Sequence, residues 1–227
     1  MASASCVAPI SRPTERSASG YLLGVRLAVA ALVILPAVGF ADRVITVPTG
    51  RKLSFGTVRL EYNSQLNDRR RNEWSLGVGA TDSIELEIRN RSSRDRDGEG
   101  FTTLDFGYNL LTPIPDTSPG ITVGVQDLLD ATEIGRRGYL ALTYRISYDS
   151  FDAESTAEFT LGGFFGKSAT PYIGISVPLS KRFRLLADHN GEALSGGLEL
   201  MLVKEISVRY FAEGKHTFLG ISAAKRF

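Results

Sequence analysis

A hydrophobic period of two runs through almost the whole chain after residue 51. In residues 83–89, isoleucine and leucine at the even positions alternate with serine, glutamate and arginine at the odd positions. Because successive side chains of a β-strand point to opposite faces, this pattern is typical of strands with one apolar and one polar face. The alternation recurs in residues 104–110, 140–148, 173–179 and 206–210.

Turn signals separate these segments, among them Thr81-Asp82, Asn190-Gly191 and Glu213-Gly214-Lys215. Short turns join antiparallel neighbours, since parallel pairing needs long crossovers. The pattern predicts an all-β, up-and-down meander of about 12 strands, with 10–14 compatible. A meander this long must close or stack, because open edges invite aggregation. The predicted strands are 53–63, 72–80, 83–91, 101–111, 120–126, 138–148, 156–166, 171–179, 183–189, 195–203, 205–212 and 216–226.

Residues 1–41 have a different character. The uncharged segment LAVAALVILPAV at 27–38 follows Arg26 and precedes Gly39-Phe40-Ala41, with small residues at the two positions that a signal peptidase reads. The segment is shorter than the roughly 20 residues of a membrane helix. We therefore expect a signal peptide over 1–41 with a long basic region and cleavage near Ala41, then a periplasmic lead-in at 42–51 and a β-barrel at 52–227.

The composition narrows the functional classes. The predicted signal peptide holds Arg12, Arg16, Arg26 and Glu15, so the mature chain keeps 23 of 26 basic and 24 of 25 acidic residues, a net charge of −1. This balance gives no basic field for nucleic acid. The single cysteine, Cys6, lies in the signal peptide, and only two histidines are present. We therefore expect no metal site, no cofactor and no nucleic-acid partner.

Two architectures would produce the same alternation: a water-soluble β-sandwich with its apolar faces inward, and a transmembrane β-barrel with its apolar face toward lipid. The face opposite the apolar one favours the membrane barrel because it carries charges of both signs, which suit a polar lumen. Many predicted strands also have the 9–11 residues that cross a bilayer at a tilt. The candidate lumen charges are Arg59, Glu61, Glu85, Glu87, Arg89, Asp105, Arg145, Glu158 and Arg209.

Aromatic residues near the strand ends also favour a membrane barrel, since tyrosine and tryptophan concentrate at bilayer interfaces. These residues are Tyr62, Trp74, Tyr108, Tyr139, Tyr148, Phe165, Tyr172, Phe183, Tyr210, Phe218 and Phe227.

The last ten residues resemble the terminal strand by which bacterial outer-membrane barrels are recognised for assembly. Gly220 and the terminal Phe227 are the candidate assembly signal, and Lys225 interrupts the apolar face where an apolar residue is expected. The resemblance implies the barrel assembly machinery and outer-membrane lipid as partners, in a Gram-negative-type bacterium.

Three motifs together resemble YjbH-type proteins, the exopolysaccharide-associated outer-membrane barrels. Val47-Pro48-Thr49-Gly50 before Gly56-Thr57-Val58-Arg59-Leu60 is similar to their opening, and Gly124-Val125-Gln126-Asp127 to a central element. Leu185–Gly191 followed by Gly196-Gly197 resembles their late hairpin, with Asp188 where the family has glutamate. The resemblance implies a role in cell-envelope or exopolysaccharide biology, with polysaccharide or envelope proteins as partners.

Catalysis is not expected. Asp188, His189 and Asn190 are adjacent in one strand end, so their side chains alternate in direction and cannot converge as a hydrolase triad. No Gly-x-Ser-x-Gly elbow occurs.

Pairing between inner arginines and carboxylates predicts a closed or very narrow lumen. The alternative function is a narrow passive channel whose selectivity is set by inner charges such as Arg59 and Glu85. A barrel hydrolase around His189 and a soluble secreted β-sandwich are lesser alternatives.

Overall fold

The computed structural model describes residues 43–67, 71–93, 100–147 and 156–227. The predicted signal peptide 1–41 lies outside these residues, so its cleavage near Ala41 stays a prediction. The described chain forms twelve β-strands: β1 Thr57–Gln65, β2 Arg71–Gly79, β3 Ile84–Ser93, β4 Phe101–Leu111, β5 Gly120–Gln126, β6 Arg137–Ser147, β7 Thr156–Phe165, β8 Ala169–Pro178, β9 Phe183–His189, β10 Leu194–Val203, β11 Ile206–Glu213 and β12 His216–Arg226.

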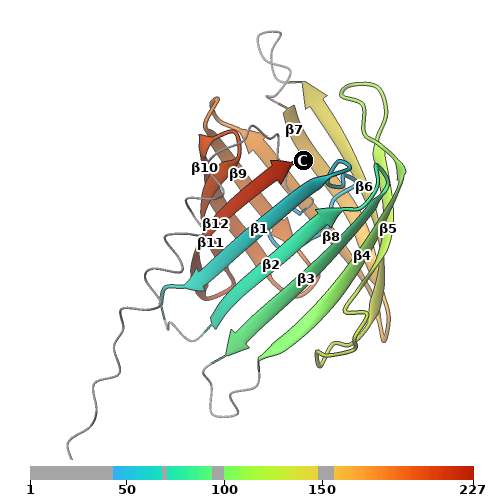
Figure 1. The fold of residues 1–227 in the computed structure, drawn as a ribbon, viewed down its shortest axis with the longest axis vertical. Coiled ribbons are helices and arrows are strands. Elements are labelled where there is room, and N and C mark those ends of the chain that lie inside the picture. The colour runs from blue at the N-terminus through green and yellow to red at the C-terminus, as the bar shows by residue number, and fades with distance from the viewer. Residues whose placement is uncertain (1–42, 68–70, 94–99, 148–155) are drawn as a thin grey trace, which may run out of the picture. The chain divides into compact units, whose positions relative to one another are not determined.

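The strands form one closed barrel in sequence order (Figure 1). Each strand pairs antiparallel with the next, and β1 closes on β12 in a register that runs from Thr57 opposite Arg226 to Gln65 opposite Phe218. The predicted up-and-down barrel of about twelve strands is confirmed, and the alternative β-sandwich is wrong because one sheet closes on itself. Within the described residues, no helix is long and apolar enough to cross a membrane.

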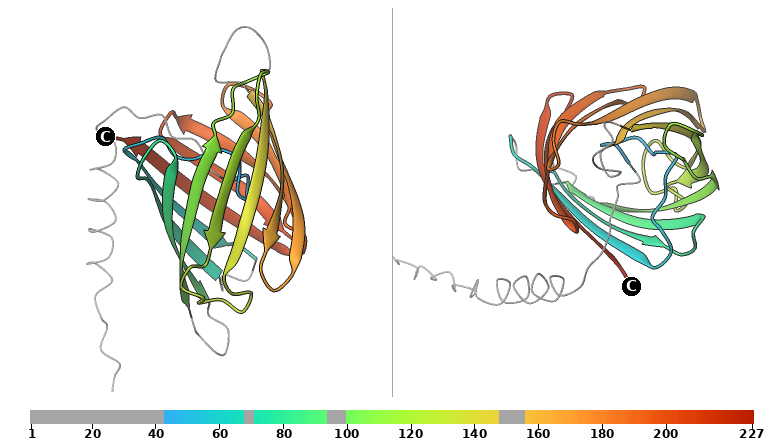
Figure 2. Two further views of the ribbon diagram at one scale, coloured as in Figure 1. Left: turned by 90° about the vertical axis from the view of Figure 1, so that its right-hand side faces the viewer. Right: turned by 90° about the horizontal axis from the view of Figure 1, so that it is seen from above.

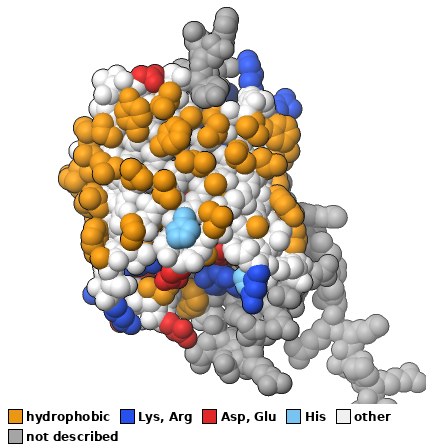
Figure 3. Space-filling model, turned by 180° about the vertical axis from the view of Figure 1, so that it is seen from behind, with side chains coloured by type: hydrophobic (Ala, Val, Ile, Leu, Met, Phe, Trp, Pro, Cys, Tyr) orange, Lys and Arg blue, Asp and Glu red, His pale blue; other side chains and the backbone are white. Residues whose placement is uncertain are grey.

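The apolar face of the sheet points outward. On β3, the side chains of Leu86 and Ile88 are 40% and 41% exposed, whereas Glu85 and Glu87 are 2% and 4% exposed. Hydrophobic side chains form a broad belt over the outer surface in Figure 3, with charged groups below it and a few above it. An outward belt over an inner polar face is the arrangement of a transmembrane barrel, in which lipid covers the apolar residues.

Most of the predicted interfacial aromatics lie on this outer surface, but three do not. Tyr62, Trp74, Tyr108, Phe165, Phe183, Tyr210 and Phe227 are exposed, whereas Tyr139, Tyr172 and Phe218 are buried and Tyr148 lies outside the described residues. Glycines on the neighbouring strands make room for the two inner tyrosines. A Cβ at Gly124 would lie 2.5 Å from the Tyr139 ring, and one at Gly162 would lie 2.2 Å from the Tyr172 ring.

Residues 43–53 lie inside the ring of strands, where they appear as the blue segment in the view along the barrel (Figure 2). We call this segment the plug. Val47, Thr49 and Leu53 are at most 2% exposed. At Gly50 the plug backbone touches the wall, because a Cβ there would lie 2.5 Å from the Gly120 carbonyl oxygen of β5. The residues expected as a periplasmic lead-in are thus, from residue 43 onward, part of the barrel interior.

Candidate functional site

A carboxylate on the barrel wall holds the tip of the plug. The plug turns sharply between Arg43 and Pro48, which form an isolated β-bridge. The backbone N–H groups of Ile45, Thr46 and Val47 donate to Oδ2 of Asp188 on β9, at 2.9, 2.6 and 3.2 Å. The Thr46 hydroxyl donates to Oδ1 at 3.0 Å. Three successive N–H groups directed at one carboxylate oxygen form an anion-binding nest, here occupied by a side chain of the same protein.

Ion pairs and hydrogen bonds anchor the rest of the plug to strands around the barrel. Arg43 pairs with Glu87 of β3, and Arg51 pairs with Glu158 of β7 at 2.6 Å. The N–H of Leu53 donates to Glu85 at 2.9 Å. The N–H of Gly50 donates to the Thr143 hydroxyl on β6 at 2.6 Å. The plug is therefore fixed to β3, β6, β7 and β9 by groups that would otherwise be desolvated without partners.

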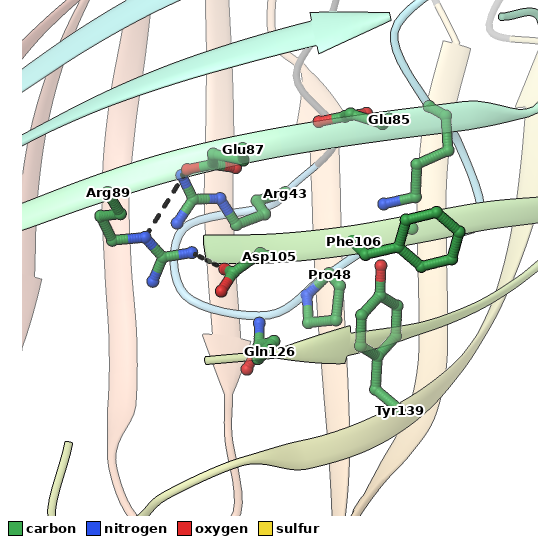
Figure 4. Close-up of a pocket in the computed structure, with 11 residues that line it drawn as sticks. Arg43, Pro48, Glu85, Glu87, Arg89, Asp105, Phe106, Gln126 and Tyr139 are labelled. Carbon is green, nitrogen blue, oxygen red and sulfur yellow. Dashed lines mark hydrogen bonds and ion pairs between the residues drawn. The ribbon is translucent and has the colours of Figure 1, made fainter. Parts of the chain in front are cut away.

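All nine predicted lumen charges lie on the inner face and form ion pairs. Arg59, only 2% exposed, lies 3.2 Å from Glu87, and Arg209 lies 2.9 Å from Glu199 and 3.6 Å from Glu61. Arg145 lies 3.2 Å from Glu158. In Figure 4, Arg89 lies between Glu87 and Asp105, and its Nη2 is 2.8 Å from Asp105. Alternating signs on neighbouring strands cancel the charge locally, so the lumen wall presents no continuous path of one sign.

A small apolar core lies between the plug and one side of the wall. It consists of Val44, Val47, Tyr139, Ala141, Phe164, Tyr172 and Leu186. The methyl groups of Val44 and Val47 fill the space that Gly174 leaves on β8. Two cavities beside the plug measure only ≈ 20 and ≈ 10 Å³, close to the volume that one water needs. Around the plug, the lumen is thus filled by protein.

One larger cavity opens at the barrel end opposite the C-terminus. It measures ≈ 300 Å³ and is polar, with the plug tip at its base; we call it the cup. Its charged lining residues are Arg43, Arg71, Arg89, Arg91, Arg137, Glu61, Glu73, Glu192 and Glu213. Three asparagines and the stacked pair Phe211 and Phe218, whose ring centroids are 5.1 Å apart, also line the cup.

The loop 127–136 forms part of the cup rim through Ile134. Asp127 orders this loop: it accepts hydrogen bonds from the Ala131 N–H at 2.9 Å, the Thr132 N–H at 2.8 Å and the Thr132 hydroxyl at 2.7 Å. Burial raises the pKa of Asp127, but these hydrogen bonds together outweigh burial, and the pKa lies below its ordinary value.

Neither histidine is among the residues that line the cup. His189 is exposed on the outer face of β9 and accepts a hydrogen bond from the Gly191 N–H at 3.1 Å. His216 is the first residue of β12, on the strand face of the buried Phe218, and its ring nitrogen lies 2.9 Å from the Gln65 amide nitrogen. Among the described residues, no group of three or more histidine, cysteine, aspartate or glutamate side chains is placed to hold a metal ion.

The two residues of the candidate assembly signal have different surroundings. Gly220 faces inward, where a Cβ would lie 2.1 Å from the Asn63 amide oxygen. Phe227 is 78% exposed and its N–H donates to the Gly56 carbonyl at 2.9 Å. Lys225 is 8% exposed, with its ammonium 4.5 Å from the Phe227 ring centroid. Whether the assembly machinery reads these residues stays a prediction.

Comparison with known proteins adds little beyond the fold. No protein-family model matches the chain, and no curated protein matches it. One similar solved structure is the crystal structure of the N-terminal β-barrel domain of Pseudomonas aeruginosa OprF. It has 15% sequence identity, covers 77% of this chain and all of that chain, and gives a TM-score of 0.27. A likeness this slight carries no argument about this chain.

Sequence reasoning missed three functional groups: the plug, its anchor Asp188, and Arg137 in the cup. The plug has no alternation to identify it. From the sequence, Asp188 is considered only in the late-hairpin motif and in the rejected hydrolase triad; the available signal is an acid that alternates with Leu185 and Ala187 and so falls on a different face of β9 from His189.

Proposed function

We propose that this protein is an outer-membrane β-barrel without catalytic activity, that its lumen is closed, and that it serves cell-envelope or exopolysaccharide biology. The observation that carries the proposal is the plug, whose contacts with β3, β6, β7 and β9 span the lumen. A barrel held shut in this way is suited to display a surface rather than to conduct solutes. The envelope role rests on the resemblance to YjbH-type barrels.

We infer the orientation from the strand count and from the single longest connection. An even number of strands puts both ends of the barrel domain on one side, and the cup opens on the other. The longest connection between strands, 127–136, lies at the cup end. Outer-membrane barrels have short periplasmic turns and longer outer loops. The cup therefore faces the cell exterior in this proposal.

Conductance across a planar bilayer tests the closed barrel against the narrow channel. The protein is purified from outer membranes, and its folded state is verified by different gel mobilities of boiled and unboiled samples. We expect no conductance steps from the folded protein. Regular ion-selective steps would reject the closed barrel in favour of the channel, and recovery of the protein in the soluble periplasmic fraction would reject both.

A further inference from the structure

The arginines that line the cup differ in how they are neutralised. Arg91 lies 2.7 Å from Glu73, Arg71 lies 3.6 Å from Glu213, and Arg89 lies 2.8 Å from Asp105. Arg43 pairs with Glu87. These four arginines therefore already have carboxylate partners within the protein.

Arg137 differs from these four. Its Nε donates to the amide oxygen of Gln126 at 3.0 Å, and its guanidinium carbon lies 3.7 Å from the centroid of the Phe164 ring. No carboxylate of a described residue lies within ion-pair distance of it. Stacking on Phe164 fixes the guanidinium plane, and the Gln126 contact uses the Nε side, so the two Nη groups remain as donors. A half-buried guanidinium held in this way is prepared to receive a planar anion.

The other residues that line the cup indicate what kind of ligand would bear the anionic group. The amides of Asn63, Asn72 and Asn190 line it, and Glu192 supplies a further acceptor. Phe211 and Phe218 add a small apolar wall. A ligand with several hydroxyl groups and a compact apolar face suits such a lining, whereas a bare inorganic anion would leave the amide oxygens and the apolar wall unused. At ≈ 300 Å³ the cup is at the lower end of small-ligand sites, so it holds a small group such as one sugar ring.

We propose that the cup binds one carboxylate-bearing sugar residue, with its carboxylate on Arg137. The sugar is either a free sugar acid or the exposed unit of an acidic polysaccharide, since the two present the same chemistry. This inference deepens the proposed envelope function and depends on it for the outward orientation of the cup. The plug closes the base of the cup, so the ligand binds at the surface and does not pass through.

The test measures binding of glucuronate, glucose and inorganic phosphate to the purified, folded barrel in detergent by calorimetry or ligand-observed NMR. We expect glucuronate to bind and both comparison ligands to bind at least about tenfold more weakly, as the loss of charge-assisted or amide hydrogen bonds implies. A second arm offers a short glucuronate-containing oligosaccharide. Tighter binding of the oligosaccharide identifies the polysaccharide as the source, and equal binding identifies the free sugar acid.

Three variants locate the site. Arg137→Gln should weaken glucuronate binding about tenfold or more. Arg136→Gln is the matched control, because the neighbouring Arg136 is exposed and its guanidinium donates to the Leu128 carbonyl outside the cup. Ile134→Trp adds bulk at the cup rim without touching the wall, so it should block binding even if Arg137→Gln does not fold.

The proposal is overturned if glucuronate does not bind, if glucose or phosphate binds equally well, or if Ile134→Trp and a folded Arg137→Gln bind like the parent. These results are independent of conductance. A conducting barrel that still binds glucuronate would reject the closed lumen and keep the site, whereas a closed barrel without binding would reject the site alone.

Discussion

Replacing Asp188 by asparagine should release the plug. The carboxylate accepts four hydrogen bonds from the plug tip, and it is 2% exposed, so water does not substitute for it in the parent protein. Asparagine keeps one acceptor oxygen, but it loses the charge and turns an NH₂ group toward N–H donors. At about 1.5–3 kcal/mol for each bond to a charged group, and without full additivity, the tip loses about 3 kcal/mol of anchoring. The population with a displaced tip should rise roughly 100-fold.

Two measurements test this prediction: the conductance of Asp188→Asn, and the conductance of the same variant with an engineered disulfide that acts as a reversible lock on the plug. We expect Asp188→Asn to give brief conductance steps that the parent lacks. In a second protein, Val44→Cys and Gly174→Cys are added, because a β-carbon at 174 would lie 3.4 Å from the Val44 Cβ, close to disulfide geometry. The lock should abolish the steps, and a reductant should restore them. If Asp188→Asn remains silent, or if the oxidised lock leaves its steps unchanged, then Asp188 does not hold the lumen shut.

Three further predictions concern the wall, the rim and the outer surface. Gly124→Ala should destabilise the barrel by about 1–3 kcal/mol in urea unfolding, because its Cβ would overlap the Tyr139 ring. Gly138→Ala is the control with a nearest neighbour at 3.7 Å, and a matching loss there would contradict the packing argument. The lowered pKa of Asp127 means that its contribution to loop stability is present above the unfolded pKa of about 3.9 and is lost as the pH falls through the lower folded value. The protection of the loop amides against hydrogen exchange, relative to the intrinsic exchange rate at each pH, should therefore fall below about pH 4 in the parent, and Asp127→Asn should remove that pH dependence. Trp74, the only tryptophan of the chain and 42% exposed, should be quenched by brominated lipid, most strongly when bromine is shallow in the bilayer; an absence of quenching would mean that lipid does not cover this face.

The barrel wall could be predicted from the sequence because its determinants are local. Alternation in residues 83–89 fixes which side chains share a face, and turn residues separate the strands. Periodicity alone does not say which face is inside. Charges of both signs on one face, such as Glu87 and Arg89, indicate which face is inside, since a polar lumen accepts them and lipid does not.

The plug could not be predicted, because its hydrogen bonds are not local. The N–H of Ile45 finds its partner 143 residues away, at Asp188. For the same reason the first strand was predicted too early, at 53 instead of Thr57: the N–H of Leu53 bonds to the Glu85 side chain and not to a neighbouring strand. The inward turn of Tyr139 depends on Gly124 directly opposite it, a pairing that the sequence alone does not reveal.

The position of the plug has a consequence for the order of folding. The seam between β1 and β12 joins Thr57 to Arg226, the most distant pairing along the chain, and such closures come late because of their loop entropy. The hydrogen bonds and ion pairs of the plug with Glu85, Thr143, Glu158 and Asp188 hold it to β3, β6, β7 and β9. A growing sheet can therefore curve around this segment before β1 and β12 pair. The segment then acts as an internal template for the curvature of the wall.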